Sequence, residues 1–173
     1  MGLSQGCAAS IVATLLWKDK PFGALVGMCG YLPFRKGMQD WAEGAGSGHH
    51  DLLVGSDAEA DDMFERDGED AEGGTKIAKA VEWLCEELQT GEGGIDFTEP
   101  HPVQSIPAFM GHGTEDQKVP TAIGRLAAEF LSDIDVDVIW KEYEGLGHWY
   151  SEDMLRDVVL FLNDLKGWGH SPE

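Results

Sequence analysis

The feature that most constrains this chain is the alternation of short apolar runs with helical patterns. The run FGALVGMC at 22–29 is almost continuously apolar, as expected for a parallel strand buried on both faces. A second run, IPAFM at 106–110, leads into a polar loop, and Val136, Val138 and Trp140 alternate with more polar residues as in a third strand. Four segments have the composition or the apolar spacing of helices: 5–16, 76–88, 121–131 and 151–165. This order predicts an α/β fold with a parallel sheet flanked by helices.

The pentapeptide Gly2-Leu3-Ser4-Gln5-Gly6 has the pattern G-x-S-x-G. Its glycines suit a tight turn from a strand into a helix, which exposes the serine hydroxyl. We therefore expect Ser4 to be a nucleophile. The backbone N–H of Gln5 and the positive end of the following helix would stabilise an oxyanion. Taken alone the pattern is weak evidence, because it occurs by chance in many proteins.

Two further candidates follow later strands of the predicted sheet. Asp116 comes after the strand ending near Met110, and His148 comes after the strand ending near Tyr143. Because the carboxyl ends of parallel strands meet at one edge, we expect both side chains to converge with Ser4. An imidazole can take the serine proton while a carboxylate holds the imidazole in the required tautomer. The chain order Ser, Asp, His is the order found in α/β-hydrolases.

Each of these residues also has an ordinary structural interpretation. Asp116 could cap the helix that follows it, and His148 could be a surface or turn residue. His112 is an alternative base, but it precedes Asp116 by only four residues, on the same predicted loop, and could instead support that loop. We favour His148. Three more residues are candidates for an acyl-binding groove, although packing beside the site explains them equally well: Tyr31, Leu32 and Trp149.

Composition restricts the partners and the compartment. The formal net charge of −20, with 12 scattered Lys and Arg residues, argues against nucleic acid and against electrostatic docking on anionic membranes. The most apolar stretch, 22–34, is too short to span a bilayer, so we expect no stable membrane insertion. Cys7, Cys29 and Cys85 form no C-x-x-C pair, which argues against a disulfide framework and a zinc site. No signal peptide is readable, and we predict a cytoplasmic protein without a metal.

Residues 35–74 are rich in Gly, Asp and Glu and predict a solvated or partly disordered acidic insertion. The segment does not fit a calcium loop: counted from Asp57, position six is Asp62 instead of Gly and position twelve is Gly68 instead of Glu. The adjacent pair His49-His50 would chelate a metal only weakly, since neighbouring side chains diverge.

Four motifs, in this order, carry a family resemblance: GLSQGCA at 2–8, GYLP at 30–33, PAFMGHGTEDQKVP at 107–120 and YEGLGHW at 143–149. Together they resemble the phospholipase/carboxylesterase family of α/β-hydrolases, which includes the acyl-protein thioesterases. The resemblance covers residues 1–34 and 103–166. It implies Ser4 as nucleophile, Asp116 as acid and His148 as base. It also implies hydrolysis of acyl esters or thioesters, on lipids or acylated proteins, without a cofactor. The presence of Cys7 after the serine turn resembles the pattern in the fungal branch of this family.

The start of the chain departs from the family pattern. Family members carry about half a domain ahead of the serine turn, including its strand and a second oxyanion donor, whereas only Met1 precedes the motif here. We therefore expect residues 1–173 to be one partial domain, the C-terminal part of an α/β-hydrolase fold with its N-terminal strands missing. Loss of one oxyanion donor costs about 10²–10³ in rate, so we expect impaired activity. Two alternatives stay open. One is an inactive remnant whose acidic insertion binds a basic protein, and the other is a homo-oligomer or other complex that supplies the absent half.

Overall fold

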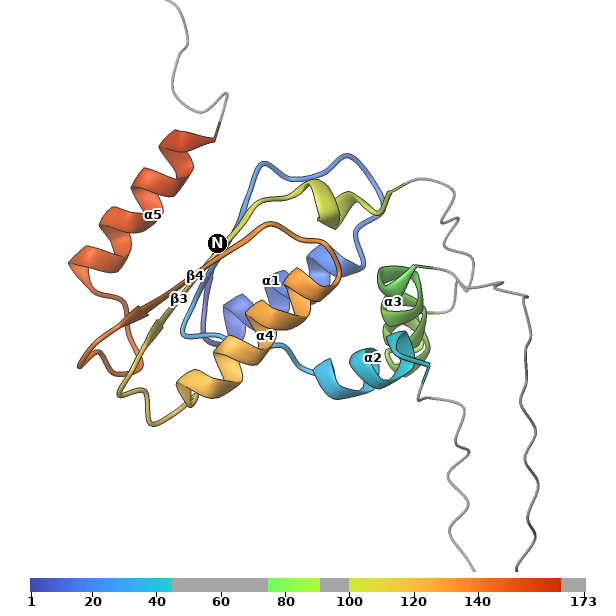
Figure 1. Ribbon diagram of the computed structural model, residues 1–173, viewed down its shortest axis with the longest axis horizontal. Coiled ribbons are helices and arrows are strands. Elements are labelled where there is room, and N and C mark those ends of the chain that lie inside the picture. Colours follow the sequence, from blue (N-terminus) through green and yellow to red (C-terminus); the bar gives the residue numbers. More distant parts are fainter. Residues whose placement is uncertain (45–74, 91–99, 166–173) are drawn as a thin grey trace, which may run out of the picture.

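The computed structural model describes residues 1–44, 75–90 and 100–165, and its centre is a parallel sheet (Figure 1). The four strands are ordered β1-β2-β3-β4, so each lies beside its predecessor in the chain. Their bounds are β1 Gly2–Leu3, β2 Leu25–Met28, β3 Ala108–Gly113 and β4 Val138–Tyr143. All three pairings are parallel, and every connection contains a helix, which confirms the predicted α/β class.

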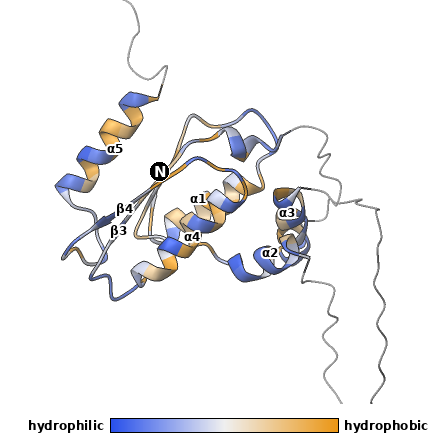
Figure 2. Cartoon of the chain, in the orientation of Figure 1, coloured by the Kyte–Doolittle hydropathy of each residue, from blue (hydrophilic) through white to orange (hydrophobic). Residues whose placement is uncertain are grey.

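The helices are α1 Gln5–Leu15, α2 Arg35–Ala42, α3 Lys76–Glu87, the 3-10 helix η2 Pro102–Ser105, α4 Thr121–Asp133 and α5 Glu152–Asp164. The four helices expected from sequence are confirmed, with ends that differ by at most a few residues. Figure 2 shows hydrophobic and hydrophilic stretches alternating along α4 and α5, as in amphipathic helices. None of the helices in the described ranges combines the length and the hydropathy needed to cross a bilayer.

Helix α2 occupies the first residues of the segment expected to be an acidic insertion. It packs on α3 through Gly37, where an added Cβ would lie 2.3 Å from the Trp83 ring. Met38 on the same helix is fully buried. The segment therefore begins with a packed helix. Residues 45–74, which include the tested calcium loop and His49-His50, lie outside the described residues.

The sheet separates two apolar layers because successive strand residues point to opposite faces. On one face Leu25, Ala108 and Met110 join the larger core with residues of α1, α3 and α4. On the other face Val26 and Phe109 pack against α5, with the Phe109 and Phe161 rings 5.7 Å apart. Figure 1 shows this division, with α1 and α4 on one side of the strands and α5 on the other.

The strand that precedes Ser4, expected to be missing, is present as two residues. Gly2 pairs with Gly27 and Leu3 pairs with Met28, in parallel register. The register continues into the turn, because the Ser4 N–H donates to the Met28 carbonyl at 2.9 Å. These contacts place the start of α1 beside β2.

Cys7 lets α1 approach β2 closely. Its side chain is completely buried, and an added Cβ at Gly27 or Gly30 would lie 2.5 Å or 2.3 Å from its Sγ. Burial raises the pKa of Cys7 to about 12, so the thiol is neutral and serves as packing. The core directly beneath the serine turn thus depends on small residues on both elements.

Candidate active site

Polar and nucleophilic side chains gather at the carboxyl ends of all four strands. Ser4 follows β1, Cys29 follows β2, Asp116 follows β3 and His148 follows β4. His148 Nε2 lies 2.9 Å from Ser4 Oγ, and His148 Nδ1 lies 2.7 Å from Asp116 Oδ2. The structure therefore brings together the three residues that the sequence nominated. In the tautomer with hydrogen on Nδ1, His148 donates to Asp116 and accepts from the Ser4 hydroxyl.

Ser4 sits in a strained backbone conformation. Its φ is 54° and its ψ is −119°, a region that residues with a Cβ rarely occupy. Hydrogen bonds hold this turn on both sides: the Ser4 N–H donates to Met28, and the Ser4 carbonyl accepts from the Ala8 N–H at 3.1 Å. The turn carries the hydroxyl toward His148 instead of into the core.

The side chain of Asp116 is held in place through the carboxylate oxygen that does not face His148. Oδ1 accepts hydrogen bonds from the backbone N–H groups of Lys118 and Val119, both at 2.9 Å. Its side chain is fully buried. Burial opposes ionisation, yet the hydrogen bonds from Val119, His148 and Lys118 together lower the pKa of Asp116 below its usual value. The group is therefore a carboxylate with one oxygen committed to the loop and one facing the imidazole.

His112, the alternative base, lies inside β3 and not on the loop where it was expected. The strand continues past Met110 because His112 and Gly113 still pair with β4. The ring is completely buried, with Nε2 2.9 Å from the Val119 carbonyl and 3.2 Å from Asp116 Oδ2. His112 thus supports the loop that carries Asp116, while His148 contacts Ser4.

A cavity of about 410 Å³ opens at this strand edge. Its lining residues are Ser4, Gln5, Tyr31, Lys118, Val119, Pro120, Ile123 and His148. Sequence reasoning did not select the wall formed by Val119, Pro120 and Ile123. Their position shortly after Asp116, around the start of α4, was the signal that could have found them.

The three residues expected to line an acyl-binding groove have different environments in the structure. Tyr31 lines the cavity. Leu32 does not line it and packs in the larger core, with only 6% of its surface exposed. Trp149 is 57% exposed and stacks on Tyr150 with ring centroids 5.0 Å apart, outside the cavity lining. Residue type alone does not distinguish a groove position from such a core position.

Cys29 is a site neighbour that sequence reasoning did not select. It is completely buried, has a φ of 47°, and its Sγ donates to the Trp149 carbonyl at 3.2 Å. Burial raises the pKa of the Cys29 thiol, and the Asp116 carboxylate adds to this effect. Cys29, Asp116 and His148 each offer a metal-ligating atom, and these atoms lie within 4.8 Å of one another. An apolar run such as 22–29 gave no signal of this proximity.

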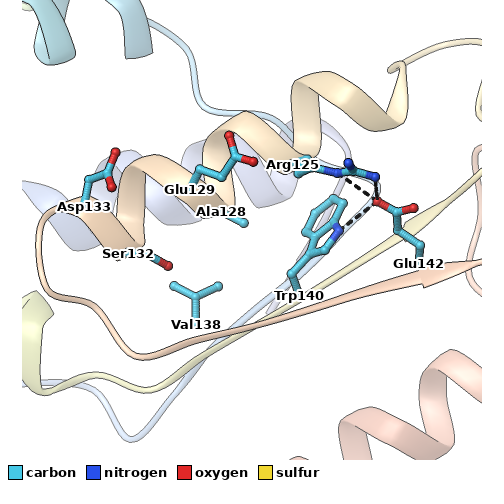
Figure 3. Close-up of a pocket in the computed structure, with 8 residues that line it drawn as sticks. All are labelled: Arg125, Ala128, Glu129, Ser132, Asp133, Val138, Trp140 and Glu142. Carbon is cyan, nitrogen blue, oxygen red and sulfur yellow. Dashed lines mark hydrogen bonds and ion pairs between the residues drawn. The ribbon is translucent and has the colours of Figure 1, made fainter.

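A second cavity, of about 610 Å³, lies between α4 and β4 (Figure 3). One end is closed by Glu142, which accepts from the Arg125 guanidinium and, at 2.9 Å, from the Trp140 indole N–H. These hydrogen bonds lower the pKa of Glu142. None of the residues nominated from sequence lines this cavity.

Two comparisons of the sequence with known proteins point to the same family of hydrolases. Residues 96–166 match the profile of the Phospholipase/Carboxylesterase family. Acyl-protein thioesterase 1 of Gibberella zeae is 45% identical over 59 residues, which cover 34% of this chain and 25% of that protein. The resemblance to the phospholipase/carboxylesterase family is confirmed.

Weaker matches to this hydrolase family extend over nearly the whole chain. Acyl-protein thioesterase 1 of Yarrowia lipolytica is 22% identical over 165 residues, covering 94% of this chain and 47% of that protein. The crystal structure of acyl-protein thioesterase 2 from Zea mays superposes with a TM-score of 0.55 at 16% identity, covering 94% of this chain and 53% of that one. This likeness supports the α/β-hydrolase fold. The chain spans about a quarter to a half of the length of these curated relatives.

Proposed function

We propose that this chain is a serine hydrolase that cleaves carboxylic esters or thioesters through an acyl-enzyme on Ser4. The observation that carries the proposal is the hydrogen-bonded series Asp116–His148–Ser4, with distances of 2.7 Å and 2.9 Å, beside a cavity of about 410 Å³. A nucleophile within reach of a base, itself oriented by a third group, is the arrangement that acyl transfer requires.

The first half-reaction follows from the proton positions. Ser4 Oγ attacks the acyl carbonyl carbon while His148 Nε2 takes the hydroxyl proton. The Asp116 carboxylate, whose pKa is lowered, stabilises the imidazolium that forms. Collapse of the tetrahedral intermediate releases the alcohol or thiol, which receives the proton from Nε2. The acyl group then remains as an ester of Ser4.

The second half-reaction uses the same groups. Water enters the cavity, gives its proton to His148 Nε2 and attacks the Ser4 ester. The proton returns to Ser4 Oγ as the carboxylic acid leaves, which restores the resting state. Gln5 is the first residue of α1, so its N–H has no acceptor within the helix and can donate to the oxyanion together with the positive helix end.

The cavity favours substrates with an apolar acyl group. Val119, Pro120 and Ile123 form an apolar wall, and Tyr31 adds an aromatic surface. The relatives named above are acyl-protein thioesterases, which motivates the extension from oxygen esters to thioesters. We therefore propose acyl esters and thioesters, of lipids or acylated proteins, as the substrate class.

The test compares Ser4→Ala with Ser10→Ala, a matched control on the same helix. The Ser10 hydroxyl is bound to the Gly6 carbonyl within α1 and lines no part of the cavity. We expect the purified chain to hydrolyse p-nitrophenyl acyl esters and to be labelled at Ser4 by a fluorophosphonate. Ser4→Ala should reduce hydrolysis by at least about 10³-fold and abolish labelling, since a triad nucleophile acts as a unit with its base. Ser10→Ala should retain both.

Equal hydrolysis by Ser4→Ala and the unsubstituted chain would refute the proposal. A folded chain that neither reacts with the probe nor hydrolyses any ester would instead favour the inactive alternative, in which the acidic segment binds a basic protein. The rate of labelling also tests the sequence-based expectation of impaired activity. Slow labelling that is still specific for Ser4 would support that expectation.

A further inference from the structure

We propose that Cys29, Asp116 and His148 form a binding site for a zinc ion, and that an ion bound there switches off hydrolysis at Ser4. Their ligand atoms Sγ, carboxylate oxygen and imidazole nitrogen lie within 4.8 Å of one another. The binding claim stands on this geometry alone, whereas the inhibition rests on the proposed function.

The donor set is one that zinc prefers. A thiolate and an imidazole select borderline-soft ions, and a single carboxylate is compatible with them. With metal–ligand bonds of about 2.0–2.3 Å, tetrahedral ligands lie roughly 3.3–3.8 Å apart. His148 Nδ1 and Asp116 Oδ2, now 2.7 Å apart, would separate by about half an ångström, and no pair would have to close by more than about an ångström, since all lie within 4.8 Å.

The groups around the three residues already favour metal binding. Asp116 Oδ1 is held by the N–H groups of Lys118 and Val119, which leaves Oδ2 directed at the site. Hydrogen bonds of this kind orient metal-binding carboxylates. The Trp149 carbonyl oxygen lies 3.2 Å from Cys29 Sγ, so it or a solvent molecule can complete the coordination.

Zinc binding would block the base by moving the ring hydrogen of His148. The Cys29 thiol releases its proton to solvent and binds as thiolate. The metal takes the Nδ1 lone pair of His148, and the ring hydrogen moves to Nε2. A protonated Nε2 cannot accept from the Ser4 hydroxyl, which it faces at 2.9 Å. No electrons are transferred, so chelation of the metal restores the resting state.

Binding can be measured without any reaction. We would titrate the full chain, carrying His49→Ala and His50→Ala to remove the adjacent histidine pair, with Co²⁺ as a spectroscopic substitute for zinc. We expect a thiolate-to-cobalt charge-transfer band that Zn²⁺ displaces. Cys29→Ser should abolish the band, whereas Cys85→Ser, which changes the half-buried thiol on α3, should keep it. Since loss of an outer partner costs about 10–100-fold in metal affinity, loss of the Cys29 ligand should cost at least as much.

The second measurement is Zn²⁺ inhibition of ester hydrolysis, reversed by a chelator. Inhibition of each variant is measured relative to its own rate without metal, and Cys29→Ser should require at least about tenfold more Zn²⁺ for the same fractional inhibition. Absence of a thiolate band, or an equal Zn²⁺ affinity in Cys29→Ser, overturns the binding proposal. A band that depends on Cys29 in a chain that hydrolyses nothing would support the metal site and count only against the proposed function.

Discussion

Replacing Asp116 by asparagine removes one negative charge and preserves the shape of the side chain. In the native arrangement Oδ1 accepts from the Lys118 and Val119 N–H groups, and Oδ2 accepts from His148 Nδ1 at 2.7 Å. The asparagine oxygen can satisfy only one of these positions. The two backbone donors will retain it, because they are fixed at 2.9 Å, and the amide NH₂ must then face His148.

An NH₂ group opposite Nδ1 selects the wrong histidine tautomer. Nδ1 becomes the acceptor, Nε2 carries the hydrogen, and the Ser4 hydroxyl loses its base at 2.9 Å. The corresponding change in a serine protease triad lowers kcat by about 10⁴, which is about 5 kcal/mol of transition-state stabilisation. Loss of the charge-assisted bond should cost about 1–3 kcal/mol in stability, so the variant remains foldable.

The assay is p-nitrophenyl ester hydrolysis with a circular dichroism melt of the same sample. The matched control is Asp157→Asn on α5, since Asp157 also accepts a hydrogen bond from a ring substituent, the Tyr143 hydroxyl at 2.7 Å. We expect Asp116→Asn to lose about 10⁴ in rate and Asp157→Asn to lose almost nothing. If a folded Asp116→Asn chain kept more than about a tenth of the rate, His148 would not depend on this carboxylate, and the proposed roles would be wrong.

Two predictions concern stability. Gly30→Ala places a Cβ 2.3 Å from Cys7 Sγ and should lower the free energy of unfolding by about 1–3 kcal/mol, whereas Gly6→Ala meets nothing within 4 Å. Denaturant unfolding checks this, and the loss should shrink in a Cys7→Gly background; an undiminished loss would mean that another contact is responsible. The hydrogen bond from Lys141 lowers the pKa of Asp157, so its stabilising effect is present above the unfolded-state pKa and disappears as the pH falls through the folded-state value. Asp157→Asn should therefore unfold more easily near neutral pH and no more easily in acid, and an equal difference at every pH would contradict this.

Much of the fold could be predicted because its elements are strongly periodic. The apolar run at 22–29 contains β2, and the regular spacing in α4 and α5 predicted two helices, which the structure places on opposite faces of the sheet. Helix α2 was not predicted because it has only eight residues and lies in a segment rich in Gly, Asp and Glu, which hid its short apolar face around Met38. It forms by packing on α3, where Gly37 admits the Trp83 ring, and such a contact is invisible in a single segment.

The candidate site was predictable where strand order determines position. Ser4, Asp116 and His148 each follow a strand, so a parallel sheet brings them to one edge. The structure adds the distances between these side chains, which the spacing of residues in the sequence does not give. Cys29 was not selected because its residue type and apolar surroundings are those of a core position. Its proposed metal-binding role depends on Asp116 and His148, which lie far from it in the chain.

The site is built on two strained strand ends. Ser4 and Cys29 both have positive φ, 54° and 47°, on adjacent strands, and each such residue costs about 1–3 kcal/mol. This strain persists only where surrounding contacts over-determine it, and one of the groups packed beneath these strand ends is Cys7, which fills the space between α1 and Gly30. Relaxation of either turn would move Ser4 Oγ away from His148 or Cys29 Sγ away from Asp116. Packing beneath the sheet edge therefore controls both the proposed hydrolysis and the proposed metal site, so a change at Cys7 should weaken the two together while leaving the α5 face of the sheet unchanged.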